Sequence, residues 1–84
     1  MMSVLEKIIN QIELILKENE MEGEVSDNTS LLNDFAIDSV VAIEILVSME
    51  ELFDITIDDE DLSLELLDTP ITLCKYIERQ LKKK

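Results

Sequence analysis

Apolar residues recur along the first segment at intervals of three and four, which is the spacing of one helical face. The stripe consists of Val4, Leu5, Ile8, Ile9, Ile12, Ile15 and Leu16. Ser3 precedes it, and Glu6 follows three residues later, which is the pattern of a capping box. The pattern predicts an amphipathic helix from about Ser3 to Glu18.

The pattern of apolar and polar residues also predicts a loop, a second helix and a short turn in the middle of the chain. Residues 19–37 contain Gly23 and a polar cluster, and so predict a long loop held to the core by Leu31, Leu32 and Phe35. A second helix is expected from Asp38 or Ser39 to about Phe53, because this run lacks Gly and Pro. Residues 58–64 could form one short helical turn.

A last helix is expected to begin at Thr69 and Pro70, a cap residue followed by proline at the first helical position. Its inward residues would be Ile71, Cys74, Ile77 and Leu81. We therefore expect an all-α fold, a small bundle of three main helices plus one short helix. It would form a single domain over residues 1–84, with a basic C-terminal tail at 82–84.

The second helix carries more apolar surface than a core needs. One face gathers Ala42, Ile45, Leu46, Met49, Leu52 and Phe53, and the opposite side carries Val40, Ile43 and Val47 among acidic residues. The extra residues are either ordinary exposed aliphatic side chains, one of them touching the loop, or the apolar centre of a docking surface for a basic partner.

Charge narrows the possible functions. Seven basic residues against twenty acidic ones give 7 − 20 = −13, and no basic residue lies between Glu18 and Cys74. Five of the seven basic residues are in the last ten positions, which disfavours nucleic-acid binding. Without His, and with one Cys and one Gly, the chain lacks the usual metal ligand, a disulfide and a phosphate-binding loop, so we expect neither a metal site nor catalysis.

The acidic run from Asp58 to Asp61 is not a calcium loop, because the required glycine is missing. The longest unbroken apolar run, Val40 to Ile43, is far shorter than a membrane span of about 18 residues. We therefore expect a cytoplasmic protein with no membrane span.

Ser39 follows Asp38 where the loop meets the second helix. Such a pair most often caps a helix, because its side-chain oxygens accept hydrogen bonds from free backbone N–H groups. No histidine is present to activate Ser39 as a nucleophile. A helix N-terminus does favour an attached phosphate, so a serine there suits modification by another enzyme.

Several segments together resemble the acyl carrier protein family over nearly the whole chain. The resemblance rests on residues 34–40 (DFAIDSV), 43–45 (IEI), 49–55 (MEELFDI), Ile57, 59–61 (DED), Thr69 and 76–77 (YI). It implies that a phosphopantetheinyl transferase attaches phosphopantetheine from coenzyme A to Ser39, with Asp38 assisting. The chain departs from the family pattern at Ala36 and Val40, where Gly and Leu are usual. It departs also at Val41, a position that is usually acidic in fatty-acid synthesis carriers, and this departure favours a dedicated pathway over housekeeping fatty-acid synthesis.

The resemblance also implies that the chain is a carrier and not an enzyme. Its arm would hold acyl-type intermediates as thioesters for a loading ligase or acyltransferase and for downstream synthases or transferases with basic docking patches. The expected partner-binding residues are Val40, Val41, Ile43, Glu44, Val47, Glu51, Asp59, Glu60 and Asp61, and we expect a monomer.

Two alternatives remain open from the sequence. The arm could serve aminoacyl or aryl transfer, as in D-alanylation, nonribosomal peptide assembly or siderophore assembly. A protein of another class, a small acidic helical interaction or inhibitor protein, would use the same charge without needing Ser39.

Overall fold

A computed structural model describes residues 3–21, 23–35, 37–58, 60 and 63–83. It contains three long helices, α1 (Val4–Glu18), α3 (Ser39–Phe53) and α4 (Pro70–Lys82). Two short elements connect them, the helix α2 (Leu31–Asp34) and the 3₁₀ helix η2 (Leu64–Leu67). No strand is present in the described part of the chain, which confirms the predicted all-α bundle.

Local capping sets where each long helix begins. Ser3 Oγ accepts a hydrogen bond from the Glu6 N–H at 3.1 Å, and the Thr69 side chain accepts one from the Thr72 N–H at 3.3 Å. Pro70 then occupies the first turn of α4. These side chains satisfy backbone donors that a helix start leaves without an intrahelical partner, so the predicted starts of α1 and α4 are confirmed.

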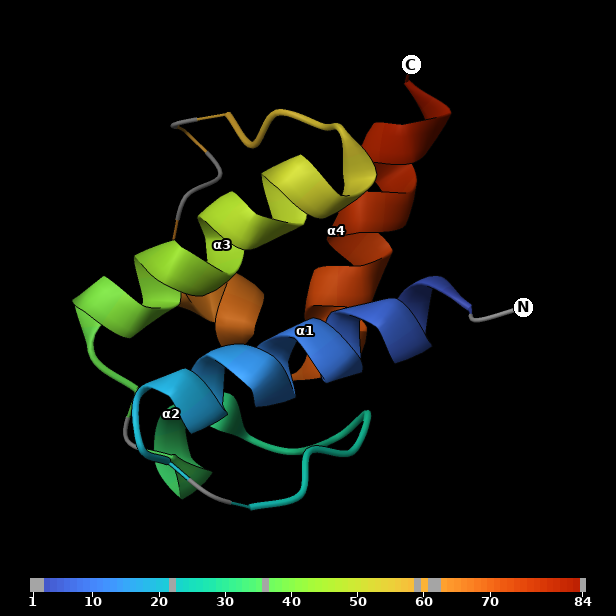
Figure 1. Ribbon diagram of the computed structural model, residues 1–84. Coiled ribbons are helices and arrows are strands. Elements are labelled where there is room, and N and C mark those ends of the chain that lie inside the picture. Colours follow the sequence, from blue (N-terminus) through green and yellow to red (C-terminus); the bar gives the residue numbers. More distant parts are fainter. Residues whose placement is uncertain (1–2, 22, 36, 59, 61–62, 84) are drawn as a thin grey trace.

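The helices pack as a bundle in which α1 contacts both α3 and α4 (Figure 1). The core contains Ile8 and Ile12 of α1, Ile45 and Met49 of α3, and Leu73 and Ile77 of α4, together with residues of the connecting segments. Each helix thus contributes one stripe to a shared interior. In α4 the expected Cys74 and Ile77 are buried, but so are Leu73 and Tyr76, which were not expected, and the expected Ile71 and Leu81 are only half-buried.

The segment between α1 and α3 contains the short helix α2, which the prediction of a long loop did not include. Leu31 is fully buried at the start of α2, and its N–H donates to the Asp68 carbonyl at 3.1 Å. Gly23 has a φ of 152°, and a Cβ there would lie 2.8 Å from Cε1 of Phe35. A larger residue at position 23 would therefore disturb both the backbone and the packing of Phe35.

Two predicted features lie partly outside the described residues. In the predicted turn at 58–64, Glu60 has 3₁₀ conformation and residues 59, 61 and 62 lie outside the described part, and the 3₁₀ helix η2 (Leu64–Leu67) begins at the last residue of that range. Of the predicted basic tail at 82–84, Lys82 is the last residue of α4 and residue 84 lies outside the described part. Cations there interact favourably with the helix dipole.

Candidate functional site

The Asp38–Ser39 pair stands at the N-terminus of α3. Asp38 is the N-cap, and its Oδ1 accepts a hydrogen bond from the Val41 N–H at 2.9 Å. Ser39 is the first residue of the helix, and both side chains are exposed. Of the two candidate cap residues, Asp38 therefore performs the capping, and the Ser39 hydroxyl has no hydrogen-bond partner within the described part of the chain.

Buried residues hold this exposed pair from both sides. Ile37 before it and Val41 after it both lie in the hydrophobic core. The chain therefore rises to the surface for three residues, Asp38 to Val40, between two core anchors. Because packed anchors restrict the backbone, Ser39 is presented at a defined place on the surface.

Val41 differs from its expected role. It was expected on the partner-binding surface, but only 4% of the residue is exposed, so it is not available for such contact. The physical reason is its direction: Val41 lies one turn before Ile45, and both point into the core.

We expect Asp38→Ala to lower the free energy of unfolding by about 1 kcal/mol, because the Val41 N–H loses its acceptor. Asp38→Ser keeps a capping oxygen and should retain most of the stability. Urea unfolding followed by circular dichroism measures both variants. Equal destabilisation by Ala and Ser would show that the cap hydrogen bond is not the source of the effect.

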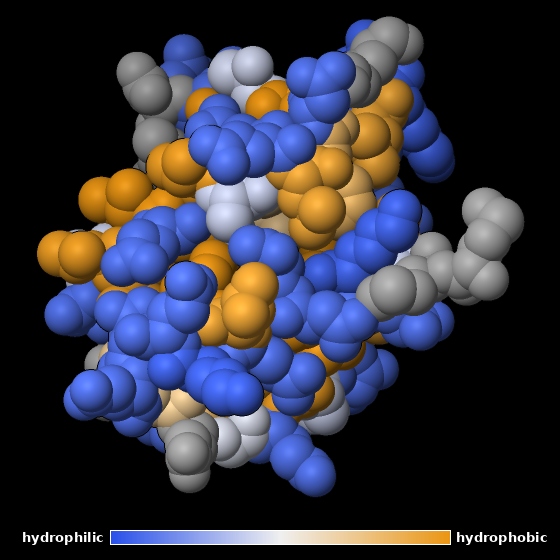
Figure 2. All heavy atoms as spheres, viewed as in Figure 1, coloured by the Kyte–Doolittle hydropathy of each residue, from blue (hydrophilic) through white to orange (hydrophobic). Residues whose placement is uncertain are grey.

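The outward side of α3 carries an apolar ridge, formed by Val40, Ile43 and Val47. Their exposed fractions are 64%, 59% and 44%. In the space-filling view, apolar side chains reach the surface between hydrophilic ones at the left of the molecule, where the first turns of α3 lie (Figure 2). The three aliphatic residues predicted on this face are therefore exposed together, as a docking surface requires.

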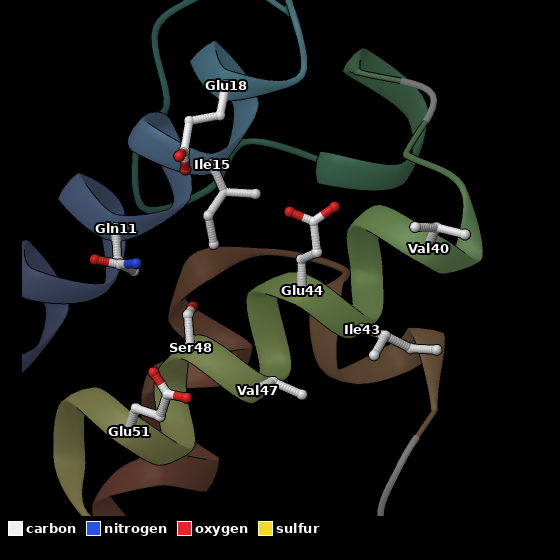
Figure 3. A pocket seen from close by; sticks show the side chains of 9 residues that line it. All are labelled: Gln11, Ile15, Glu18, Val40, Ile43, Glu44, Val47, Ser48 and Glu51. Atoms are coloured by element: carbon white, nitrogen blue, oxygen red, sulfur yellow. The ribbon is translucent and has the colours of Figure 1, made fainter.

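An open groove of about 500 Å³ lies beside this ridge, between α1 and α3 (Figure 3). It is lined by Gln11, Ile15, Glu18, Val40, Ile43, Glu44, Val47, Ser48 and Glu51. The predicted residues Glu44 and Glu51 are exposed and belong to it. Gln11 and Glu18 were not foreseen, because only the packing of α1 on α3 brings them here.

The acidic residues outside the groove differ in exposure and in hydrogen bonding. Glu60 is exposed, whereas Asp59 and Asp61 lie outside the described residues. Glu50, next to Glu51 in the sequence, is half-buried, and its Oε2 accepts a hydrogen bond from the Ile57 N–H at 2.9 Å. Glu50 therefore holds the chain that follows α3, which gives it a structural role.

Cys74 is the one cysteine of the chain, and it is buried in α4. Burial, helped by the nearby Glu78 carboxylate that accepts its S–H, raises the pKa of this thiol to about 11. At neutral pH the group therefore stays protonated, and the protonated thiol is a poor nucleophile.

The geometry at Ser39 fits an attached phosphodiester. Its hydroxyl is exposed and has no partner within the described part, and it stands at a helix N-terminus, where free N–H groups and the dipole favour negative charge. No group of three His, Cys, Asp or Glu residues in the described ranges is placed to hold a metal ion. Among the described helices, none is long and apolar enough to cross a bilayer.

Comparison with known proteins assigns the class. Residues 6–77 match the family described as the phosphopantetheine attachment site. The chain is 37% identical to the acyl carrier protein of Buchnera aphidicola over 79 residues, covering 94% of this chain and 91% of that protein. It is 28% identical to the acyl carrier protein of Thermotoga maritima over 82 residues, covering 95% and 99%.

A third relative matches over a shorter stretch. The acyl carrier protein of Desulforapulum autotrophicum is 47% identical over 38 residues, which cover 45% of this chain and 49% of that protein. The fold, the exposed serine and these matches agree. The chain belongs to the acyl carrier protein family, whose members carry phosphopantetheine and work with partner enzymes.

Proposed function

We propose that Ser39 is the attachment point for phosphopantetheine and that the protein carries acyl-type intermediates between partner enzymes without catalysing a reaction itself. The arm holds its cargo as a thioester on its terminal thiol. The observation that supports this assignment best is the exposed Ser39 hydroxyl at a helix N-terminus that Asp38 already caps. Modification therefore breaks no hydrogen bond found in the described part of the chain.

Asp38 and Ser39 have different roles in the attachment of phosphopantetheine. The Ser39 oxygen forms the new ester bond to phosphorus as the bond between that phosphorus and the rest of coenzyme A breaks, and the hydroxyl proton passes to the transferase. Asp38 caps the helix and so fixes the backbone of the acceptor. Its carboxylate is exposed next to the reacting oxygen, where the family resemblance has it assist the transferase.

Partner enzymes dock on the exposed face of α3. The ridge formed by Val40, Ile43 and Val47 offers apolar contact area, and Glu44, Glu51 and the acidic residues at 59–61 attract basic patches. The partners are a phosphopantetheinyl transferase, a loading ligase or acyltransferase, and downstream synthases or transferases. A dedicated biosynthetic pathway in the cytoplasm, with the carrier as a monomer, is the setting that we propose.

Incubating the protein with coenzyme A and a transferase of broad specificity should add the mass of one phosphopantetheine group, measured on the intact chain. Isolation of the chain from its native host, with the thioester preserved, should then show an acyl group on the arm. No mass gain after complete incubation would contradict the carrier function and favour an acidic interaction protein. An aminoacyl or aryl group on the arm would reassign the cargo and keep the carrier.

A further inference from the structure

The groove beside α3 has a second wall, which α1 provides. Gln11, Ile15 and Glu18 of α1 line it opposite residues of α3. In Figure 3, Ile15 and Glu18 extend from α1 toward α3, and Glu44 and Ser48 extend from α3 into the same space. The surface next to the proposed arm site is therefore built by two helices and not by α3 alone.

The side chains of this surface change from apolar on the outer side of α3 to acidic on the side that faces α1. Val40, Ile43 and Val47 point away from α1 and form the apolar ridge (Figure 3). On the α1 side of that ridge, the carboxylates of Glu18, Glu44 and Glu51 line the groove. A partner that covers both parts needs an apolar stripe with positive charge along one side of it.

The three carboxylates lack a positive partner in the described part of the molecule, where no ion pair involves any of them. No basic residue occurs between Glu18 and Cys74, and neither Lys17, next to Glu18, nor Lys7, one turn before Gln11, lines the groove. Negative charges gathered along one groove repel one another, and a cation placed between them removes that repulsion. A partner molecule can supply that cation.

The spacing of the ridge indicates the form of that molecule. Its residues follow the i, i+3, i+7 pattern of one helix face and span about 10 Å at 1.5 Å per residue. A helical surface has no free backbone edge to which a strand could be added. Ridges of this kind pack into the grooves between side chains of a second helix.

We infer that α1 supplies half of the docking site and that the groove receives a basic amphipathic helix of a partner enzyme. Apolar side chains of that helix pack on Val40, Ile43 and Val47. A Lys or Arg beside them enters the groove between Glu18 and Glu44, with its aliphatic stem over Ile15. Glu18 is thus a specificity residue outside α3, and this inference rests on the proposed carrier function.

A synthetic helix tests the inference directly. The probe is a peptide of about four turns with Leu on one face and Lys and Arg on the other, and its control is a peptide of the same composition in scrambled order. Titration into the full-length ¹⁵N-labelled protein should shift the signals of both helices. The side-chain amide of Gln11 reports on the α1 wall, and the backbone signals of Ile43 and Val47 report on the ridge.

Charge reversal at Glu18 gives the matched comparison. Glu18→Lys should raise the dissociation constant for the peptide about fivefold, and Glu18→Gln should raise it by an intermediate amount. Glu24→Lys makes the same change in net charge at an exposed residue that does not line the groove, and should alter binding by less than about twofold. Circular dichroism checks that the variants keep their helices.

Three results would overturn the inference: shifts confined to α3, equal effects of the Glu18→Lys and Glu24→Lys substitutions, or equal binding of the scrambled peptide. In the last case the groove would recognise charge alone. Intact-mass analysis after exhaustive incubation with coenzyme A and the transferase tests the carrier function separately. A chain that accepts the arm but binds the peptide without regard to Glu18 refutes the α1 docking wall alone.

Discussion

Ser39→Ala should abolish the gain of one phosphopantetheine group on the intact chain, because the variant lacks the oxygen that would form the ester. The fold should not change measurably. Ser39 is exposed at the first position of α3, and Asp38, not Ser39, caps the helix. We therefore expect the free energy of unfolding to stay within about 0.5 kcal/mol of the parent protein.

Ser26→Ala provides the control at a second exposed serine. The hydroxyls of Ser26 and Thr29 share a hydrogen bond at 2.9 Å, and Ser26 does not line the groove beside α3. This variant should be modified to completion. A mass gain that survives in Ser39→Ala and disappears in Ser26→Ala would move the attachment point and refute the assignment.

Ile45→Ala should remove about 2–5 kcal/mol from the free energy of unfolding, because it leaves a cavity at a fully buried position of α3. For 84 residues, typical values per residue give a total stability of about 4–13 kcal/mol. One truncated side chain thus removes a large share of the total. The variant should be partly unfolded at a urea concentration at which the parent protein remains native.

Ile43→Ala makes the same chemical change two residues away, where the side chain is 59% exposed. Its effect on stability should be within about 0.5 kcal/mol. The pair separates the two faces of α3, since one isoleucine would serve the core and the other would serve docking. Equal losses of stability in urea unfolding would show that the outward face is also packed in solution.

The sequence allowed the long helices to be predicted because their start signals are local. Ser3, Asp38 and Thr69 each hydrogen-bond to a backbone N–H three residues later. That information lies within a few residues of the chain. The apolar spacing likewise indicated the buried face of α1. In α4 it indicated Cys74 and Ile77 correctly but missed Leu73 and Tyr76, which are also buried.

Features set by distant contacts could not be predicted in this way. Helix α2 is held by the hydrogen bond from Leu31 to the Asp68 carbonyl, which joins positions 37 residues apart. Leu52 was expected in the core but is 44% exposed, in a surface hollow that it shares with Leu14 of α1. A helical wheel gives the direction of a side chain but not which neighbour covers it.

In the candidate site, too, features set by local sequence could be predicted and features set by distant contacts could not. Ser39 and Asp38 could be assigned from a short contiguous motif, and the exposed ridge of α3 from its periodicity. Val41 was misplaced because it borders that ridge in sequence yet turns inward, toward Ile45. Glu18 could not be found, because its relation to Glu44 depends on how α1 lies against α3.

The setting of Cys74 has a practical consequence for measuring the state of the carrier. A thiol with a pKa of about 11, buried in the bundle, reacts slowly with alkylating reagents at neutral pH while the fold is intact. An arm attached to the exposed Ser39 would extend from the surface and place its terminal thiol in solvent. A thiol-specific dye applied to the folded protein would therefore report the fraction of arms that carry no cargo, without prior replacement of the native cysteine.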